Sequence, residues 1–163
     1  MSKLNRVARI VSKLKKSPEF MHSWVLSTAF GYMIPYAGRT KVRIEQLTDS
    51  KSIITIKNRR KVQNHIGSIH ATAIAIAAES ATGYLVAMNV PDSSVPVIKT
   101  LKVDYEKRCK GNIKAVATLT EEQRDQIRTQ EKGELAVAVT ITDSENKEPV
   151  QCEMVWAWTA KRR

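Results

Sequence analysis

The stretch that decides the fold is NHIGSIHATAIAIAAESATG, residues 64–83. From residue 66 to residue 87 the chain has no proline and consists largely of alanine and aliphatic side chains. This composition predicts a helix over 66–87 that is apolar nearly all round, and therefore buried rather than amphipathic. Its many alanines would let a sheet approach closely.

On both sides of this helix the pattern changes to the alternation with a period of two that is typical of strands. The strands that we predict cover residues 42–44, 53–57, 95–105, 113–119, 135–142 and 150–158. Asp49-Ser50 predicts a turn, and the charged insert 121–132 is either a helix or a loop. Trp156 and Trp158 fall on one face of the last strand, which favours packing on the sheet over stacking on nucleic-acid bases.

The N-terminal part has helical periodicity. A basic amphipathic helix is expected over 3–16, ending before Pro18, and a second helix over 19–30. A bend follows at Pro35/Gly38. The first helix could lie on an anionic membrane, but packing over the pocket or against a subunit is the favoured interpretation.

The element order is therefore helical segment, two strands, one buried helix and four strands. A helix that is apolar all round needs cover on every side, and a curved antiparallel sheet supplies it. This predicts the α+β architecture called a hotdog fold. We expect a single domain over 1–163, with an N-terminal helical segment at 1–31 and the hotdog core at 40–163.

Composition limits the classes of function. The net charge of +11 favours a polyanionic partner: nucleic acid, acidic lipid or a ligand with several phosphates. The N-terminal pattern lacks an apolar h-region, so no secretory signal is expected, and no apolar run is long enough for a membrane span to be expected. Cys109 and Cys152 are far apart, and His22, His65 and His70 do not cluster with them, so neither a disulfide nor a metal site is expected. The expected location is the cytoplasm.

Two features of the decisive stretch suggest chemistry. Glu79 follows a run of apolar residues, so it is a functional carboxylate, a structural one with a partner, or one that faces an open solvent edge. The turn at Gly67 leaves a helix start near His70 and Ala71, whose free N–H groups can bind an oxyanion, although every helix start has such groups. Ala71 and Glu79 are eight residues, about 12 Å, apart along the helix. Two antiparallel copies could therefore form one composite site.

The spacing of Asn64, Gly67, His70, Glu79 and Gly83 resembles the motif of hotdog thioesterases of the phenylacetate-degradation type. Residues 59–83 also resemble an uncharacterised branch of that superfamily, in which the histidine is followed by alanine. In this chain Ala71 replaces the usual glycine and Glu79 the commoner aspartate.

The resemblance implies hydrolysis of acyl-CoA or acyl-carrier thioesters by a homodimer or homotetramer. It implies no metal and no cofactor, since coenzyme A belongs to the substrate. The N–H at Ala71 would polarise the carbonyl, Asn64 would place the carbonyl or the water, and Glu79 of the neighbouring subunit would act as general base or nucleophile. Thr100 is the nearest candidate for a residue that orients the water. His70 would either cap the helix or contact the substrate or the partner's Glu79.

Basic residues that flank the predicted site are candidates for binding the phosphates of coenzyme A, or form a solvated face: Arg59, Arg60, Lys61, Lys107, Arg108 and Lys110. The main alternative function is a non-catalytic module that binds acyl-CoA. A thioester dehydratase and a nucleic-acid binder rank lower, because the chain carries no recognised motif of either class.

Overall fold

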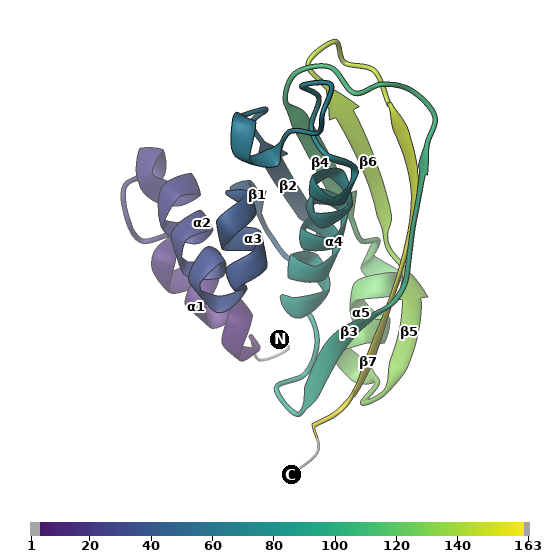
Figure 1. Ribbon diagram of the computed structural model, residues 1–163. Helices are drawn as coiled ribbons and strands as arrows, with labels where there is room; N and C mark the ends of the chain where they lie inside the picture. Colours follow the sequence, from purple (N-terminus) through teal and green to yellow (C-terminus); the bar gives the residue numbers. More distant parts are fainter. Residues whose placement is uncertain (1–3, 162–163) are drawn as a thin grey trace.

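α4 (Ala71–Ala87) forms the centre of the structure, and the strands curve around it (Figure 1). The computed structural model describes residues 4–161. Twelve of the 17 residues of α4 are buried, as expected for a helix that contacts strands on several sides. The predicted buried helix is therefore confirmed, but it begins at Ala71, because residues 66–70 lie in a loop.

Within residues 4–161, four other helices and two 3₁₀ turns precede or interrupt the strands: α1 (Arg6–Leu14), η1 (Glu19–Met21), α2 (His22–Met33), α3 (Pro35–Thr40), η2 (Arg60–Val62) and α5 (Glu121–Thr129). The bend expected at Pro35/Gly38 lies at Ile34, and the residues after it form α3, which a proline at the first helical position is well suited to start. The ambiguous insert is α5, with a capping box formed by Thr120 and Gln123. None of the helices in residues 4–161 is long and apolar enough to cross a bilayer.

The strands are β1 (Arg43–Leu47), β2 (Lys51–Ile56), β3 (Ser94–Tyr105), β4 (Ile113–Thr118), β5 (Gly133–Ala136), β6 (Ala138–Asp143) and β7 (Val150–Ala160). They pair antiparallel in the orders β1-β2-β4-β6 and β3-β7-β5. The single strand predicted over 135–142 is wrong, because the chain leaves one sheet and enters the other at Val137, whose N–H donates to the Met154 carbonyl at 2.9 Å. Through this segment the two sheets wrap α4, and the predicted α+β hotdog fold is confirmed.

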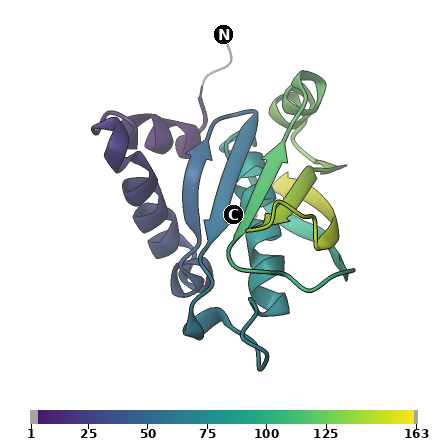
Figure 2. The same cartoon turned by 90° about the horizontal axis from the view of Figure 1, so that it is seen from above.

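The N-terminal helices lie beyond β1, at the edge of the molecule away from β3 and β7 (Figures 1 and 2). α2 packs on β1 and α3. Its buried side chains are Leu26 and Phe30, and the Phe30 ring lies 4.6 Å from that of Tyr84 on α4, measured between centroids. The predicted first helix exists as α1 (Arg6–Leu14), and residue 3 of the predicted span lies outside the described part of the chain.

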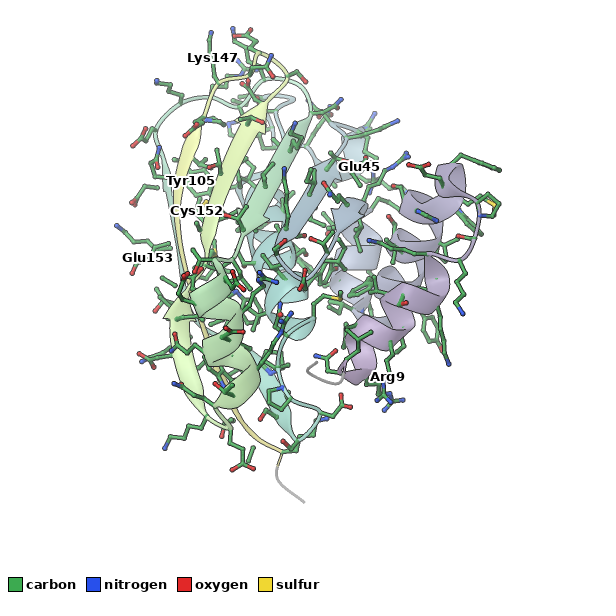
Figure 3. The ribbon with its side chains drawn as sticks, turned by 180° about the vertical axis from the view of Figure 1, so that it is seen from behind. Arg9, Glu45, Tyr105, Lys147, Cys152 and Glu153 are labelled. Carbon is green, nitrogen blue, oxygen red and sulfur yellow. The ribbon has the colours of Figure 1, made fainter. Side chains whose placement is uncertain are left out.

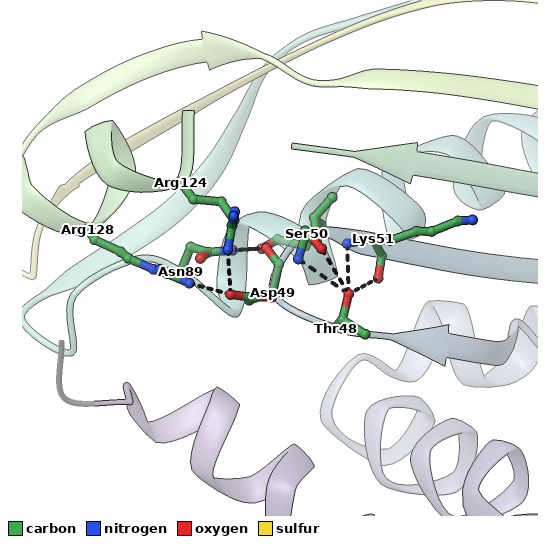
Figure 4. A network of polar contacts seen from close by, with 8 residues as sticks. Thr48, Asp49, Ser50, Lys51, Asn89, Arg124 and Arg128 are labelled. Carbon is green, nitrogen blue, oxygen red and sulfur yellow. Dashed lines mark hydrogen bonds and ion pairs between the residues drawn. The ribbon is translucent and has the colours of Figure 1, made fainter. Parts of the chain in front are cut away.

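α5 is fastened to the turn between β1 and β2 by one carboxylate. Asp49 accepts from Arg124 at 2.7 Å and from Arg128 at 2.8 Å, and its backbone carbonyl accepts from Asn89 at 2.8 Å (Figure 4). The hydrogen bond from Arg128, supported by Arg124, lowers the pKa of Asp49 despite partial burial. This network closes the end of the core at which α4 terminates.

Gly83 allows β7 to approach α4 closely, so a substitution at Gly83 tests this packing directly. A Cβ at this position would lie 2.6 Å from two ring atoms of Trp156, whose indole N–H is fixed by a 2.8 Å bond to Thr82 Oγ1. We expect Gly83→Ala to lower the free energy of unfolding by about 1–3 kcal/mol in urea titrations, although alanine favours helix by about 1 kcal/mol. In a Trp156→Leu background Gly83→Ala should lower the free energy of unfolding by less, because the ring that the new Cβ would meet is gone. An equal loss in both backgrounds would contradict the close packing of Trp156 on Gly83.

Candidate active site

One stripe of α4 stays uncovered within the chain. Thr72, Ala75 and Glu79 are exposed or half-buried, whereas the residues between them are buried or nearly so. Their spacings of three and four residues place them on one face of the helix. The uncovered stripe thus runs from the start of α4 to its only carboxylate.

The amide groups at the start of α4 can be accounted for one by one. The N–H of His70 donates to the Val62 carbonyl at 2.8 Å, that of Thr72 to His70 Nδ1 at 3.2 Å, and that of Ala73 to the His70 carbonyl at 2.9 Å. Across residues 4–161 the N–H of Ala71 has no protein acceptor. A free donor at a helix N-terminus, where the helix dipole is positive, can stabilise an anionic oxygen.

His70 is the N-cap of α4. Its Nδ1 accepts from Thr72 N and lies 2.9 Å from Thr72 Oγ1, which in the neutral ring places the proton on Nε2. The ring is exposed, which leaves Nε2–H free to donate outward. His65 is also exposed, in the loop before the helix.

The loop before α4 is organised by Asn64. Its Oδ1 accepts from the N–H groups of Ile66 and Ser68, both at 3.1 Å, and Gly67 adopts φ +74°, a conformation that favours glycine. The side-chain oxygen of Asn64 is therefore used to build the loop. Its Nδ2 has no acceptor within the described chain, so only the amide N–H₂ is available for other contacts.

Two residues that were not predicted as structural parts of the site hold this loop and helix start in place. Arg108 donates from Nε to Ser68 Oγ and from Nη2 to the Ile66 carbonyl, both at 2.9 Å. Tyr105, at the end of β3 (Figure 3), donates from its hydroxyl to the Ala71 carbonyl at 2.7 Å. Burial raises the pKa of Tyr105, which keeps the phenol protonated for this bond. No local pattern in the sequence signals either contact, since both span more than 30 residues.

Glu79 is half-buried on α4, and its carboxylate forms no hydrogen bond or ion pair with any residue of the described chain. Desolvation by burial raises its pKa above that of an ordinary glutamate. Within one chain the carboxylate is thus unpaired, which excludes the structural alternative in which a partner in the same chain satisfies it. A raised pKa suits a group that must accept and return a proton.

Thr100 is not brought to this face. β3 has a bulge between Ile98 and Thr100, after which Thr100 pairs with Val155 instead of Met154. Directly paired residues of antiparallel strands share a face, and Met154 is buried toward the core. The bulge therefore turns Thr100 to the outer face of the sheet, away from Glu79 of the same chain, and its role in orienting water stays a prediction.

The predicted basic residues fall into two groups. Arg59 donates from Nη2 to the carbonyls of Arg39 and Thr40, at the end of α3, and Arg108 holds the loop. Lys110 pairs with Glu145 at 2.8 Å. The remaining three are exposed and, in the described structure, form no side-chain bond: Arg60, Lys61 and Lys107.

Other candidate groups lie away from the uncovered stripe. Burial raises the pKa of both Cys109 and Cys152 to about 11, so neither thiol is ionised near neutral pH. A cavity of about 890 Å³ lies at the opposite end of α4, where α1 meets the residues after Ala87, and it does not reach Glu79. The uncovered stripe therefore remains the candidate active site.

Comparison of the sequence with known families assigns the chain to one of them. Residues 22–158 match the family described as Domain of unknown function (DUF4442), and the chain belongs to that family. No curated protein matches it.

Solved structures show the same fold. A probable thioesterase from Pseudomonas aeruginosa is 22% identical, with a TM-score of 0.73 over 80% of this chain and 91% of its own. A structural-genomics protein is 24% identical, with a TM-score of 0.74 over 95% of this chain and 99% of its own. A putative thioesterase from Shewanella oneidensis is 12% identical, with a TM-score of 0.69 over 82% and 94%. The predicted resemblance to hotdog proteins of the thioesterase type is thus confirmed for the fold.

The unpaired carboxylate predicts a pH-dependent effect on stability. Because burial raises the pKa of Glu79, the proton stabilises the folded state below the unfolded pKa of about 4.3, and this contribution is lost as pH rises through the folded pKa. Glu79→Gln should therefore melt at a higher temperature than wild type at pH 8, and the difference should disappear below about pH 4. The control Glu148→Gln, at an exposed carboxylate, should show no such trend. Identical melting curves of wild type and Glu79→Gln at every pH would contradict the desolvation of Glu79.

Proposed function

We propose that the chain hydrolyses acyl thioesters of coenzyme A or of an acyl carrier, in a site shared by two copies. The observation that carries the proposal is that α4 presents two groups without partners in the described chain. One is the free N–H of Ala71, and the other is the half-buried carboxylate of Glu79. The two groups are about 12 Å apart along α4, too far to act on one carbonyl. Two antiparallel helices would place the N–H of one copy opposite the carboxylate of the other.

The edge strand β3 supports this assembly. It is 12 residues long and, within residues 4–161, pairs only on the β7 side. Its large apolar side chains Val95, Val97, Leu101 and Tyr105 are 39–48% exposed. A long apolar edge strand is an aggregation hazard unless it is paired or covered. We infer that β3 meets β3 of a second copy, which also covers the stripe on α4.

The chemistry follows from the two groups. Glu79 of one copy accepts a proton from water as the water oxygen attacks the thioester carbonyl, and the N–H of Ala71 in the other copy donates to the developing oxyanion. The tetrahedral intermediate collapses, the C–S bond breaks, and the leaving thiolate takes a proton from Glu79. Direct attack by Glu79, with an anhydride that water then cleaves, uses the same geometry.

The supporting groups take defined parts in this proposal. Asn64 Nδ2 and His70 Nε2 are donors at the start of α4 that can hydrogen-bond the substrate. Arg60, Lys61 and Lys107 are the cations free to contact phosphates of coenzyme A, whereas Arg59 and Arg108 hold the structure around them. The names of the similar structures from Pseudomonas aeruginosa and Shewanella oneidensis, which state thioesterase activity as probable or putative, add support.

Removing the free N–H is a sharp test of the oxyanion donor. Proline lacks this N–H and is favoured at the first helical position, and His70 already has the extended φ −64°, ψ 144° that a residue before proline requires. Ala71→Pro should therefore fold normally and lose about 10²–10³-fold in kcat, and Glu79→Gln about 10²–10⁴-fold. The measurement is release of free thiol from short-, medium- and long-chain and aromatic acyl-CoAs.

Two variants serve as controls, because Ala71→Gly keeps the N–H and Glu148→Gln makes the same charge change at the surface. Both should retain near wild-type rates. If wild type hydrolyses none of the esters while acyl-CoA still raises its melting temperature, the chain is a binding module and the hydrolase proposal fails.

A further inference from the structure

α2 and its flanks carry aromatic side chains that the chain leaves uncovered. Phe20, Trp24 and Tyr32 are 86%, 64% and 89% exposed, and their spacings place them along one side of η1 and α2. The opposite side of α2 packs inward through Leu26 and Phe30. We call the three exposed aromatics the aromatic face. Apolar exposure continues just beyond it, at Met33, Ile34 and Tyr36.

The same part of the chain is strongly basic. Residues 4–42 contain seven lysines and arginines and a single acidic residue, Glu19. α1 buries its apolar side, through Ala8 and Val11, against the protein, and so presents its cations outward. Lys13 and Lys16 are exposed and form no ion pair within residues 4–161, whereas Arg9 (Figure 3) pairs with Asp92 at 2.9 Å.

Charge and position together restrict what can cover this surface. A two-fold contact between copies would bring the basic segment 4–42 against itself, because such interfaces are self-complementary. The helices also lie at the edge of the molecule opposite β3 (Figure 1), so the β3 contact does not cover them. Trp, Tyr and Phe next to lysines and arginines are complementary to the headgroup region of an anionic bilayer.

We propose that the N-terminal helices dock this protein on an anionic lipid bilayer. The aromatic face enters the headgroup region, and Lys13 and Lys16 contact anionic headgroups. This goes beyond thioester hydrolysis and does not rest on it. Apolar burial supplies one part of the affinity and electrostatic attraction the other, so salt and neutral lipid weaken the binding.

Tryptophan fluorescence tests this directly, because one tryptophan is exposed and the other two are not. Trp156 and Trp158 are 7% and 1% exposed and donate to Thr82 Oγ1 and the Gln130 carbonyl. Emission changes on adding vesicles therefore report on Trp24. With wild type and vesicles of phosphatidylcholine and phosphatidylglycerol we expect a blue shift, and quenching by brominated lipid. Vesicles of phosphatidylcholine alone should give a weaker response.

Variants separate the two parts of the affinity. Lys13→Gln with Lys16→Gln should weaken vesicle binding about 30-fold, whereas the matched pair Lys114→Gln with Lys132→Gln, in the strand region, should bind like wild type. Phe20→Ser with Tyr32→Ser keeps Trp24 as reporter and should abolish the blue shift. These positions are exposed, so melting temperatures should change little.

Three results would overturn the proposal. The first is no blue shift of wild type with anionic vesicles. The second is equal binding of the Lys13/Lys16 and Lys114/Lys132 variants. The third is a smaller oligomer for Phe20→Ser with Tyr32→Ser in light scattering, which would make the aromatic face an interface between copies. Thioester hydrolysis in solution is measured separately, so loss of either activity leaves the other proposal testable.

Discussion

The structure depends on burying a helix that has almost no polar side. α4 carries alanine, isoleucine and other apolar residues around most of its circumference, and a buried helix of this kind needs a cover on each side. The strands provide the cover by curving, with the change of sheet at Val137 and the close approach at Gly83. The small alanine side chains keep the sheet near the helix axis. Other features, including α2 and α5, seal the gaps that remain.

The cover is incomplete along one stripe, and the two groups of the proposed site lie on it or at its start. Glu79 has no partner and the N–H of Ala71 has no acceptor within the described chain. Around them the polar groups are well used: Asn64 builds the loop, Arg108 and Tyr105 clamp it, and His70 caps the helix. Because Glu79 and the N–H of Ala71 lie beside a loop and a helix start that other side chains hold in place, we propose that a ligand and a second subunit supply their partners.

The molecule thus has two opposite edges that the chain itself leaves uncovered. In the described part of the chain, β3 has no neighbouring strand at one edge, and the aromatic face of α2 is uncovered at the other. We propose that a second copy covers the β3 edge and that lipid covers the aromatic face. Because the edges lie on opposite sides of α4, both contacts fit one molecule without competing for the same surface (Figure 2).

The sequence alone predicts the features that depend on local pattern. The buried helix, most strands and the candidate pair Ala71 and Glu79 follow from periodicity and spacing, and the element order suffices for the fold. Features that depend on distant contacts are missed. The bulge that turns Thr100 outward has no sequence signal, and the contacts of Tyr105 and Arg108 to the helix start appear only once β3 lies beside α4. Composition alone extends the helix back to residue 66, whereas the turn at Gly67 places its start near His70 and Ala71, where the structure has it; Asn64 and Gly67 stabilise the loop before it.

The central claim is that the N–H of one copy and the carboxylate of the other form one site. Mixed dimers of Ala71→Pro and Glu79→Gln chains, purified with two different tags, test it most directly. In a shared site each mixed dimer has one site with both changes and one with neither, so thioester hydrolysis should return to about half the wild-type rate. Mixed dimers as inactive as both parents would show that the two groups act within one chain, and would contradict the account.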